Sequence, residues 1–443
     1  AGSAIGFVVE SHEGRPTKIE GNALHPDSLG ATNAFHQAVV LDLYDPDRST
    51  TPRMKGAEKS WADAIAALKV AGETAKGKGG QGLAVLTREH RSPTVAALLA
   101  QIKAQLPNAK IVRWEPLAPT AARDGAKLAF GRPFETIVET AKAKVILTLD
   151  ADLFWGEGRS VRSARGFADG RRLRGHSHEE AAKEMNRLYS VESNFSITGA
   201  SADHRLRLAS KDIASFVYGL AGELGKQGLA IGDLAGAVAG KKQVGAAAQR
   251  WLAPLAKDLI ANKGASLIVA GARQPAEVHA VAALLNQALG NVGSTVSYVK
   301  TFDEMPEGTA ALADLASAMK SGGVDTLVVL DGNPVLDAPA DLGFGDALAK
   351  VQTSFHLAHE VDETSEASTW HLNRAHLLEA WSDVKAADGT TSVVQPLVAP
   401  LYAGRSDIEV LDALLGPARK GYEIVRETWK GLGFEASWRR AVH

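Results

Sequence analysis

Four polar turns follow apolar runs that have the length of buried strands, and they are the first places to look for chemistry. They are Asp150–Asp152, Glu192–Asn194, Gly271–Arg273 and Asp331–Pro334. Ligands of open parallel sheets bind at the carboxyl ends of the strands, so each turn could hydrogen-bond a nucleotide-like ligand. Asp, Asn and Gly are also ordinary residues of strand-to-helix turns. For any one turn taken alone, the turn interpretation is preferred.

Histidine offers little support for a metal site. The 13 histidines are scattered, and the close pairs are His176 with His178 and His356 with His359. Zinc needs at least a third ligand and a supporting shell of hydrogen bonds. We therefore expect an exposed loop for the first pair, and ordinary packing beyond a strand for the second.

Other motifs exclude several kinds of chemistry. The chain has no cysteine, which rules out disulfides, thiolate nucleophiles and cysteine-bound zinc or iron–sulfur clusters within it. Gly77–Gly82 fits the G-x-G-x-x-G spacing but precedes a strand, so a flexible loop is expected. No P-loop, HExxH or GxSxG pattern occurs. The motifs therefore predict no catalytic, cofactor-binding or metal-ligating residue.

A dense run of arginines stands out in a chain of net charge -2, which itself argues against nucleic acid or an anionic membrane as partner. Only Glu157 and Asp169 lie near it in sequence. The run is a solvated face or a docking site for an acidic partner or a phosphate, since guanidinium groups pair well with both. Its members are Arg159, Arg162, Arg165, Arg171, Arg172 and Arg174.

The elements that must position these residues follow from apolar periodicity. Residues 5–10 and 17–20 predict a β-hairpin around the turn-forming residues 13–16. Ser92-Pro93 and Pro275 predict helix starts. Such helices alternate with short apolar runs that predict strands of parallel sheets. The predicted strands are 82–87, 110–114, 145–149, 187–192, 267–270, 296–299 and 326–330.

The fold class predicted is α/β: two doubly wound parallel-sheet units with a short N-terminal β-hairpin region. The expected division is 1–50 for the hairpin and linker region, 51–225 for the first α/β unit and 226–443 for the second, with a hinge in 222–242. A hydrophobic share of 45% and a charged share of 23% are typical of soluble globular proteins. The sequence contains no run of 18 apolar residues, so no membrane span is predicted.

Longer stretches resemble a known family. Residues 14–30 (GRPTKIEGNALHPDSLG) and 43–48 (LYDPDR) resemble the opening of the molybdopterin oxidoreductase family, GRxxKIEGNPxHPxSxG followed by LYDPDR, with Ala23 in place of proline. The likeness continues along nearly the whole chain. Its further segments are Val191–Ser193, Thr198–Ala200, Ala202–Leu206, Asp331–Pro334 and the stretch from Asp362 to Glu379.

A narrower resemblance is to one subfamily, the molybdopterin-oxidoreductase-like, iron–sulfur-associated subunit of alternative complex III. That complex is a quinol:electron-acceptor oxidoreductase of bacterial respiratory and photosynthetic chains. The matching segments are Leu149–Asp152, Ser160–Arg162, Met185–Tyr189, Glu379–Asp383, Asp388–Thr390 and Gln395–Tyr402.

The resemblance also implies what the chain lacks. Catalytic members hold molybdenum with Cys, selenocysteine, Ser or Asp, and many carry a [4Fe–4S] cluster near the N-terminus. Without cysteine the cluster and a thiolate ligand are excluded, and no Asp or Ser marks itself as a ligand. The chain also stops at His443, before the C-terminal β-barrel that completes the cofactor cleft in active relatives. We expect a cofactor-free, non-catalytic scaffold subunit, or the corresponding half of a longer subunit.

The implied partners are those of the subfamily. Iron–sulfur clusters are expected in a ferredoxin-like part, fused or separate, with multihaem cytochrome c and integral-membrane quinol-oxidising subunits completing a hetero-oligomeric complex. The complex would carry electrons from quinol to cytochrome c or another periplasmic acceptor. The expected place is the periplasmic side of the bacterial inner membrane, reached through a twin-arginine-type leader not present in this chain. The N-terminal hairpin is expected to line the junction with the cluster-bearing part.

Two alternatives stay open. One is an active molybdopterin-dependent oxidoreductase that uses Asp or Ser as the metal ligand. The other, which needs no resemblance, is a soluble two-domain ligand-binding protein. Metal analysis distinguishes the first alternative, and thermal shifts with nucleotides distinguish the second.

Overall fold

The computed structural model describes residues 4–157, 159–172, 184–431 and 434–442. The chain folds into two compact units, each assembled from stretches that are far apart in the sequence. Unit 1 comprises Ala1–Ile5, Gly21–Asn33 and Pro119–Phe302. Unit 2 comprises Gly6–Glu20, Ala34–Ala118 and Asp303–His443.

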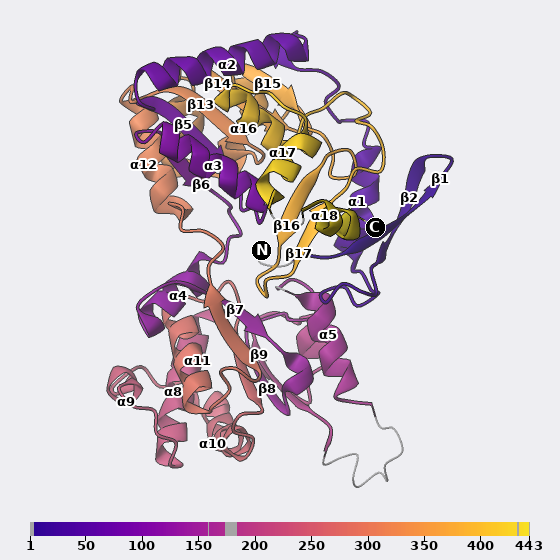
Figure 1. The fold of residues 1–443 in the computed structure, drawn as a ribbon. Coiled ribbons are helices and arrows are strands. Elements are labelled where there is room, and N and C mark those ends of the chain that lie inside the picture. The colour runs from indigo at the N-terminus through magenta and orange to yellow at the C-terminus, as the bar shows by residue number, and fades with distance from the viewer. Residues whose placement is uncertain (1–3, 158, 173–183, 432–433, 443) are drawn as a thin grey trace. The chain divides into compact units, whose positions relative to one another are not determined.

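Unit 1 contains a parallel sheet with the strand order β10-β9-β8-β11, of which β8 and β9 are labelled in Figure 1. Every side chain of β8 is buried, as expected for a parallel strand with helices on both faces. Val145 and Leu147 of β8 pack into one apolar cluster, and Ile146 between them packs into another on the opposite face. The strands are β8 (Val145–Leu149), β9 (Arg187–Glu192), β10 (His204–Arg207) and β11 (Ser266–Ala270).

Helices cover both faces of this sheet, and a two-stranded antiparallel ribbon accompanies it. On one face lie α8 (Ile213–Lys226), α10 (Ala246–Ala261) and α11 (Ala276–Ala288), and on the other lies α5 (Ser160–Asp169). The ribbon pairs β7 (Phe134–Val138) with β12 (Val296–Lys300). The remaining elements are α4 (Thr120–Phe130), η1 (Thr140–Lys142), α7 (Ile197–Ala200), η2 (Ser210–Asp212) and α9 (Leu234–Val238).

Unit 2 contains a larger sheet with the order β4-β3-β15-β14-β13-β5-β6. The five strands from β15 to β6 are parallel, and β3 and β4 continue the sheet antiparallel at one edge. The strands are β3 (Arg53–Met54), β4 (Ala57–Glu58), β5 (Gly82–Thr87), β6 (Lys110–Arg113), β13 (Val324–Leu330), β14 (Thr353–Ala358) and β15 (Trp370–Asn373).

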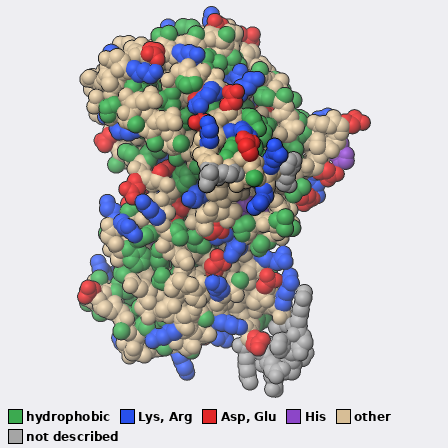
Figure 2. Space-filling view, viewed as in Figure 1, with side chains coloured by type: hydrophobic (Ala, Val, Ile, Leu, Met, Phe, Trp, Pro, Cys, Tyr) green, Lys and Arg blue, Asp and Glu red, His purple; other side chains and the backbone are tan. Residues whose placement is uncertain are grey.

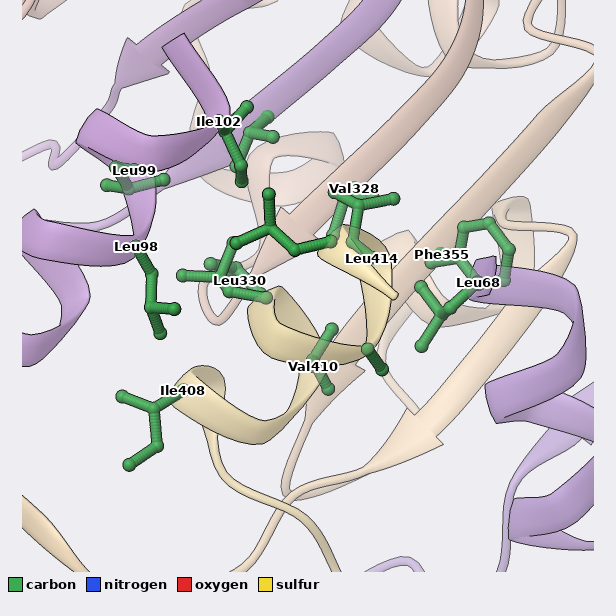
Figure 3. Packing of buried hydrophobic residues seen from close by; sticks show 14 of the residues in the cluster. Leu68, Leu98, Leu99, Ile102, Val328, Leu330, Phe355, Ile408, Val410 and Leu414 are labelled. Carbon is green, nitrogen blue, oxygen red and sulfur yellow. The ribbon is translucent and has the colours of Figure 1, made fainter. Parts of the chain in front are cut away.

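The core of unit 2 also has two sides, because successive side chains of β5 and β13 point to opposite faces. Val328 and Leu330 pack with Phe355 against α2 (Trp61–Gly77), α3 (Pro93–Gln105) and α16 (Asp407–Leu415), as Figure 3 shows. Leu327 and Val329 pack against α12 (Gly308–Lys320) and α14 (Phe344–Leu348). Gly72 of α2 makes the close α2–α16 contact possible, since a Cβ there would lie 1.9 Å from the Leu414 carbonyl oxygen.

Smaller elements surround this sheet. They include the N-terminal hairpin of β1 (Phe7–His12) and β2 (Arg15–Gly21), and a second hairpin of β16 (Ser382–Lys385) and β17 (Thr391–Val394). The helices are α1 (Ala34–Leu43), α13 (Pro334–Asp337), η3 (Ala340–Leu342), α15 (Glu363–Ala367), α17 (Gly421–Trp429) and α18 (Phe434–Val442).

The predicted α/β class, parallel sheets and N-terminal hairpin are confirmed, but the strands are distributed differently from their sequence order. β5 pairs with β13 of the C-terminal half and β6 pairs with β5, so neither strand joins the sheet of β8 and β9. The units therefore differ from the expected 51–225 and 226–443, and residues 222–242 lie inside unit 1. The predicted strand 296–299 forms an antiparallel ribbon. Apolar periodicity identifies a buried strand but carries no information about its neighbour.

Within the part of the chain that the structure describes, no helix is long and apolar enough to cross a membrane. On the face shown in Figure 2, basic and acidic side chains are interspersed, in keeping with the net charge of -2.

Candidate functional site

Each parallel sheet has a point where the strand order reverses, which is where ligands of doubly wound folds bind. In unit 1 the chain runs outward from β8 through β9 to β10, and β11 lies on the other side of β8. In unit 2, β6 lies beyond β5 on one side, and β13, β14 and β15 follow on the other. The reversals therefore fall between β8 and β11 and between β5 and β13. The turns Asp150–Asp152 and Gly271–Arg273 therefore lie together at the reversal of unit 1. The turn Asp331–Pro334 lies at the reversal of unit 2.

An aspartate with left-handed backbone ends a strand at each reversal. Asp150 follows β8 with φ 56°, and Asp331 follows β13 with φ 65°. Aspartate tolerates this conformation better than most residues because its short side chain bonds locally. At Asp331 this local bond is present, since the Gly332 amide donates to the Asp331 carboxylate at 2.7 Å. Both carboxylates therefore stand at the sheet edge where a ligand would bind.

Neutral donors surround the carboxylate of Asp150. Its Oδ1 accepts from the amide and the hydroxyl of Ser193, both at 2.9 Å. Its Oδ2 accepts from Ser210 Oγ at 2.8 Å and from Gln274 Nε2 at 3.1 Å. Burial opposes ionisation, but these bonds and nearby Arg273 lower the pKa of Asp150 overall. Gly271 allows the two turns to approach closely, because a Cβ there would lie 2.0 Å from the Asp150 carbonyl oxygen.

The neighbouring acids make this edge of unit 1 electronegative. Burial raises the pKa of Glu157 to about 7, although the Ala272 amide donates to its carboxylate at 3.3 Å. Asp152 accepts from the amide and hydroxyl of Thr198 at 3.1 and 2.7 Å. Glu192, which begins the predicted turn Glu192–Asn194, pairs with Arg205 at 2.5 Å. The hydrogen-bond donors here are thus already directed at carboxylates of the chain.

Charged donors surround Asp331 in unit 2. Arg374, which follows β15, donates to Asp331 at 2.6 Å and to Asp407 at 2.7 Å. Burial opposes it, but the two carboxylates raise the pKa of Arg374, and Arg374 in turn lowers the pKa of Asp331. Arg88 forms a two-bond pair with Glu115 at 2.8 and 2.9 Å. The guanidinium groups at this edge are therefore engaged by carboxylates of the chain.

The rest of the turn Asp331–Pro334 is held by polar contacts to α15. Asn333 Oδ1 accepts from the Thr364 hydroxyl at 2.7 Å, and that hydroxyl oxygen accepts from the Val335 amide at 3.0 Å. His356 Nε2 donates to the Gly332 carbonyl oxygen at 2.8 Å. These contacts support the turn interpretation for Asp331–Pro334.

His356 starts a hydrogen-bonded chain whose direction is determined by chemistry, because a carbonyl oxygen can only accept. Its Nδ1 must then accept from Ser365 Oγ at 2.8 Å, and Ser365 Oγ accepts from His371 Nδ1 at 2.9 Å. His371 Nε2 finally accepts from Ser49 Oγ at 2.6 Å. Burial lowers the pKa of both imidazoles, that of His371 to about 4, so both are neutral. This chain ties the Asp331 turn to the loop before β3.

A pocket of about 500 Å³ lies at the same edge of unit 2, beyond the ends of β14 and β15. His359 lines it, and burial with Arg374 nearby lowers the pKa of His359 to about 4. His376 stands beside it, with ring centroids 6.1 Å apart. Arg48 is paired in its wall with Glu379 at 2.7 Å. The lining residues are Val39, Asp42, Arg48, His359, Glu360, Arg374, Ala375, His376, Leu377, Ala380, Ser382, Val394, Ser406, Asp407 and Ile408.

The arginine run is paired within unit 1. Arg162 forms a two-bond pair with Glu139, at 2.9 Å for the shorter bond, and donates to the Pro26 carbonyl oxygen at 2.8 Å. Arg159 pairs with Asp27, and Arg171 pairs with Asp203. Arg165 and Arg172 both lie near Asp169, at 3.5 and 3.1 Å. Acids that are distant in sequence therefore neutralise much of the run.

Some predicted features lie elsewhere. Arg174, His176 and His178 lie outside the described residues. Gly77–Gly82 is the turn between α2 and β5, with positive φ at Gly79, Gly80 and Gly82. In the described ranges, no group of three or more His, Cys, Asp or Glu side chains is arranged to hold a metal ion.

Sequence reasoning missed Arg374, Asp407 and Arg48. Arg374 follows a short strand, as the four predicted turns do, but WHLN is too polar to be recognised as one. Ser406 and Glu409 form a capping box at the start of α16, a pattern that marks the helix start beside Asp407. Nothing in the sequence pairs Arg48 with Glu379, which lies 331 residues away.

The fold is shared with a solved structure. The chain matches acetylene hydratase from Pelobacter acetylenicus over 98% of its own length and 70% of that chain, with a TM-score of 0.71 and 11% identity. No protein-family model matches the sequence. At this identity the match shows the fold alone, which is a molybdopterin oxidoreductase fold.

The sequence is also similar to that of a curated protein. The chain is 27% identical, over 454 aligned residues, to the molybdopterin-binding-like subunit of menaquinone reductase from Nitratidesulfovibrio vulgaris (strain Hildenborough). The alignment covers 94% of this chain and 63% of the relative, so the chain spans less than two thirds of that protein's length. The chain is a distant homologue of that subunit.

Proposed function

We propose that the chain is a cofactor-free, non-catalytic scaffold in a membrane-associated quinone oxidoreductase complex, supporting an iron–sulfur electron-transfer part. It would be one subunit or part of a longer one. The observation that carries the proposal is that the side chains at both strand-order reversals satisfy one another.

The donor set of unit 1 does not fit the anionic dinucleotide cofactor that the family resemblance implies. A pyrophosphate needs converging hydrogen-bond donors and positive charge. Here Ser193, Ser210 and Gln274 donate to Asp150, and the Asp152 carboxylate stands beside them. Binding phosphate would break these bonds and bring negative charge against carboxylates, which supports a scaffold role.

Unit 2 supports the same conclusion with charged groups. The guanidinium groups of Arg48, Arg88 and Arg374 each pair with a carboxylate of the chain. A phosphate would have to displace those carboxylates and leave them unpaired, which is costly when they are buried. The sequence also has no cysteine to bind molybdenum as thiolate.

The proposed complex takes its partners from the family. We propose a ferredoxin-like iron–sulfur part, multihaem cytochrome c and integral-membrane subunits as partners, on the periplasmic side of the bacterial inner membrane. The sequence resemblance favours quinol oxidation as in alternative complex III. The name of the curated relative favours menaquinone reduction as the second candidate. In both cases the chain would act as a scaffold beside the electron path.

Metal analysis of the native complex tests the proposal. The complex is purified through this chain and analysed for molybdenum, iron and haem, before and after extensive dialysis. We expect iron and haem from partner subunits, and less than about 0.1 molybdenum per chain. One molybdenum per chain after dialysis would show an active molybdopterin enzyme instead. A chain that purifies alone but gains thermal stability with nucleotides would support a ligand-binding protein and contradict the scaffold role.

A further inference from the structure

Ser365 lies at the centre of the buried histidine chain of unit 2 and has two possible acceptors. While both imidazoles are neutral, its Oγ donates to His356 Nδ1 at 2.8 Å and accepts from His371 Nδ1 at 2.9 Å. The Glu360 carbonyl oxygen lies 3.4 Å from the same Oγ. A hydroxyl group has one proton to donate and two lone pairs. The proton of Ser365 can therefore serve His356 or the Glu360 carbonyl, one at a time.

A carboxylate lies beside the nitrogen of His356 that Ser365 contacts. Asp362 Oδ1 is 3.4 Å from His356 Nδ1, and as the N-cap of α15 it accepts from the Ser365 amide at 2.8 Å. While His356 is neutral, its Nδ1 has only a lone pair and cannot donate to the carboxylate. Once His356 is protonated, the same nitrogen carries a proton and the ring carries a positive charge, and both favour contact with Asp362. Asp362 therefore stabilises one protonation state of His356 and not the other.

The chain of hydrogen bonds is complete in the protonated state as well. His356 Nε2 donates to the Gly332 carbonyl oxygen at 2.8 Å in either state. In the protonated state, His356 Nδ1 donates to Asp362 or to Ser365 Oγ. The Ser365 hydroxyl then donates to the Glu360 carbonyl, while its oxygen still accepts from the other imidazole. Because a buried polar group without a partner is costly, this second complete set of bonds makes a second state of the chain accessible.

The charged groups around the two imidazoles favour different protonation states. Burial, then the charges of His356 when protonated and of Arg53, lower the pKa of His371 to about 4. Burial also lowers the pKa of His356, but there the charges of Asp362 and Asp331 oppose the fall. Opposite charge nearby favours a charged imidazole and like charge disfavours it. The first proton that the chain takes up therefore goes to His356.

We propose that His356, Ser365 and Asp362 form an acid-sensitive switch in the loop between β14 and α15. At neutral pH the Ser365 hydroxyl donates to His356. In acid His356 takes up one proton from solvent and pairs with Asp362, and the hydroxyl turns to the Glu360 carbonyl. The loop, residues 359–362, carries two residues of the pocket lining, so the switch alters a wall of that pocket. The inference depends on contacts within unit 2, so it holds whether or not the chain belongs to a quinone oxidoreductase.

NMR of the full chain, labelled with ¹³C at the histidine Cε1 position, tests the proposal. The shift of each signal follows the protonation of its imidazole as the pH is lowered from about 8 to about 4, and His356→Gln assigns the His356 signal. One test variant is Asp362→Asn, which removes the charge but keeps a good N-cap residue. The other is Ser365→Ala. The matched control is Glu366→Gln, which neutralises an exposed acid of the same helix.

We expect the two test variants to shift the titration of His356 in opposite directions. Asp362→Asn should lower its midpoint by about 1 pH unit, because the charge that favours the imidazolium is lost. Ser365→Ala should raise the midpoint, because neutral His356 loses its donor while Asp362 remains. Glu366→Gln should leave it unchanged. Equal shifts in Asp362→Asn and Glu366→Gln would show only a general effect of charge and overturn the proposal.

Two further measurements separate a switch from a histidine that merely titrates. Hydrogen exchange of residues 359–366, corrected for intrinsic rates, should change across the His356 midpoint, and in Asp362→Asn the change should move to the lower midpoint. A loop that does not respond while His356 titrates would contradict the switch. Circular dichroism should show a folded chain at the midpoint, and unfolding at a higher pH would also overturn the proposal. If Ser365→Ala does not fold, Asp362→Asn decides the outcome.

Discussion

At the two strand-order reversals, a carboxylate at the end of a central strand is satisfied in two different ways. Asp150 in unit 1 and Asp331 in unit 2 occupy equivalent places. Each aspartate has a left-handed backbone conformation and directly follows a central strand. The carboxylate of Asp150 accepts four bonds from neutral groups of Ser193, Ser210 and Gln274. That of Asp331 pairs with the guanidinium of Arg374, which Asp407 shares.

The difference determines how each edge responds to loss of a partner. Neutral donors are several and individually modest, so the loss of one leaves Asp150 largely satisfied. A single guanidinium, that of Arg374, pairs with both Asp331 and Asp407, so its loss removes the ion-pair partner of two carboxylates at once. Ion pairs of low exposure are costly to break from one side even where they add little net stability. The reversal of unit 2 should therefore be more sensitive than that of unit 1 to the loss of a single partner.

Removal of Arg374 should have the largest effect. We expect Arg374→Met to lower the free energy of unfolding by about 3 kcal/mol, at the low end for buried pairs because Asp331 is partly exposed. Urea unfolding followed by tryptophan fluorescence measures it, and six of the eight tryptophans lie in unit 2. The control is Arg172→Met, whose pair with Asp169 is exposed. A loss below about 1 kcal/mol would contradict the comparison.

The contribution of Glu157 to stability should depend on pH in the opposite sense to the contributions of Asp150 and Asp331. Burial raises the pKa of Glu157 to about 7 from an unfolded value of 4.5, so the folded state holds its proton more tightly. Stability of unit 1 should therefore fall as pH rises from 4.5 to 7, by about 2–3 kcal/mol. The pKa values of Asp150 and Asp331 are lowered, so their stabilisation persists above about pH 4 and is lost below it.

Glu157→Gln should abolish the fall in the stability of unit 1 with rising pH. Hydrogen exchange of β8 at pH 5 and pH 8 measures it within unit 1, with exposed Glu277→Gln as the control. The wild type should exchange faster at pH 8 after correction for intrinsic rates, and Glu157→Gln should not. An unchanged pH dependence in the variant would assign the effect to another group.

A smaller effect is expected at Asp150. Asp150→Asn keeps a residue that tolerates left-handed backbone, so it tests the carboxylate charge without strain. We expect a loss of about 1–2 kcal/mol, because donors aimed at Oδ2 would face the amide group. Hydrogen exchange of β8 and β9 amides reports it. A larger loss here than for Arg374→Met would reverse the comparison between the two edges.

The smallest effects should lie in the arginine run. Arg165 and its partner Asp169 are each more than 40% exposed, so Arg165→Ala should change stability by less than about 0.5 kcal/mol. Arg162→Ala should cost about 1 kcal/mol, since Arg162 holds both Glu139 and the Pro26 carbonyl. Thermal unfolding of the two variants side by side measures the difference. Equal effects would mean that the Arg162 contacts contribute nothing beyond an exposed pair.

Local features were predictable because they depend on neighbours in the sequence. The strand 82–87, the strand 145–149 and the helix start at Ser92-Pro93 are all present as predicted. Strands β14, β15 and β10 were missed because their runs carry polar residues such as His356, His371 and His204. The hydrogen bonds that make His356 and His371 acceptable inside unit 2 come from Ser365, which no periodicity reveals.

The sequence by itself determined the class of fold, the N-terminal hairpin, the absence of thiol chemistry and the four turns where strands end. Those depend on composition and on contacts within a few residues. Only the tertiary structure decided that β5 pairs with β13 and that Arg374 joins Asp331 to Asp407. The physical reason is that a buried strand or a charge finds its partner by three-dimensional packing, and apolar periodicity is the same whichever partner it has.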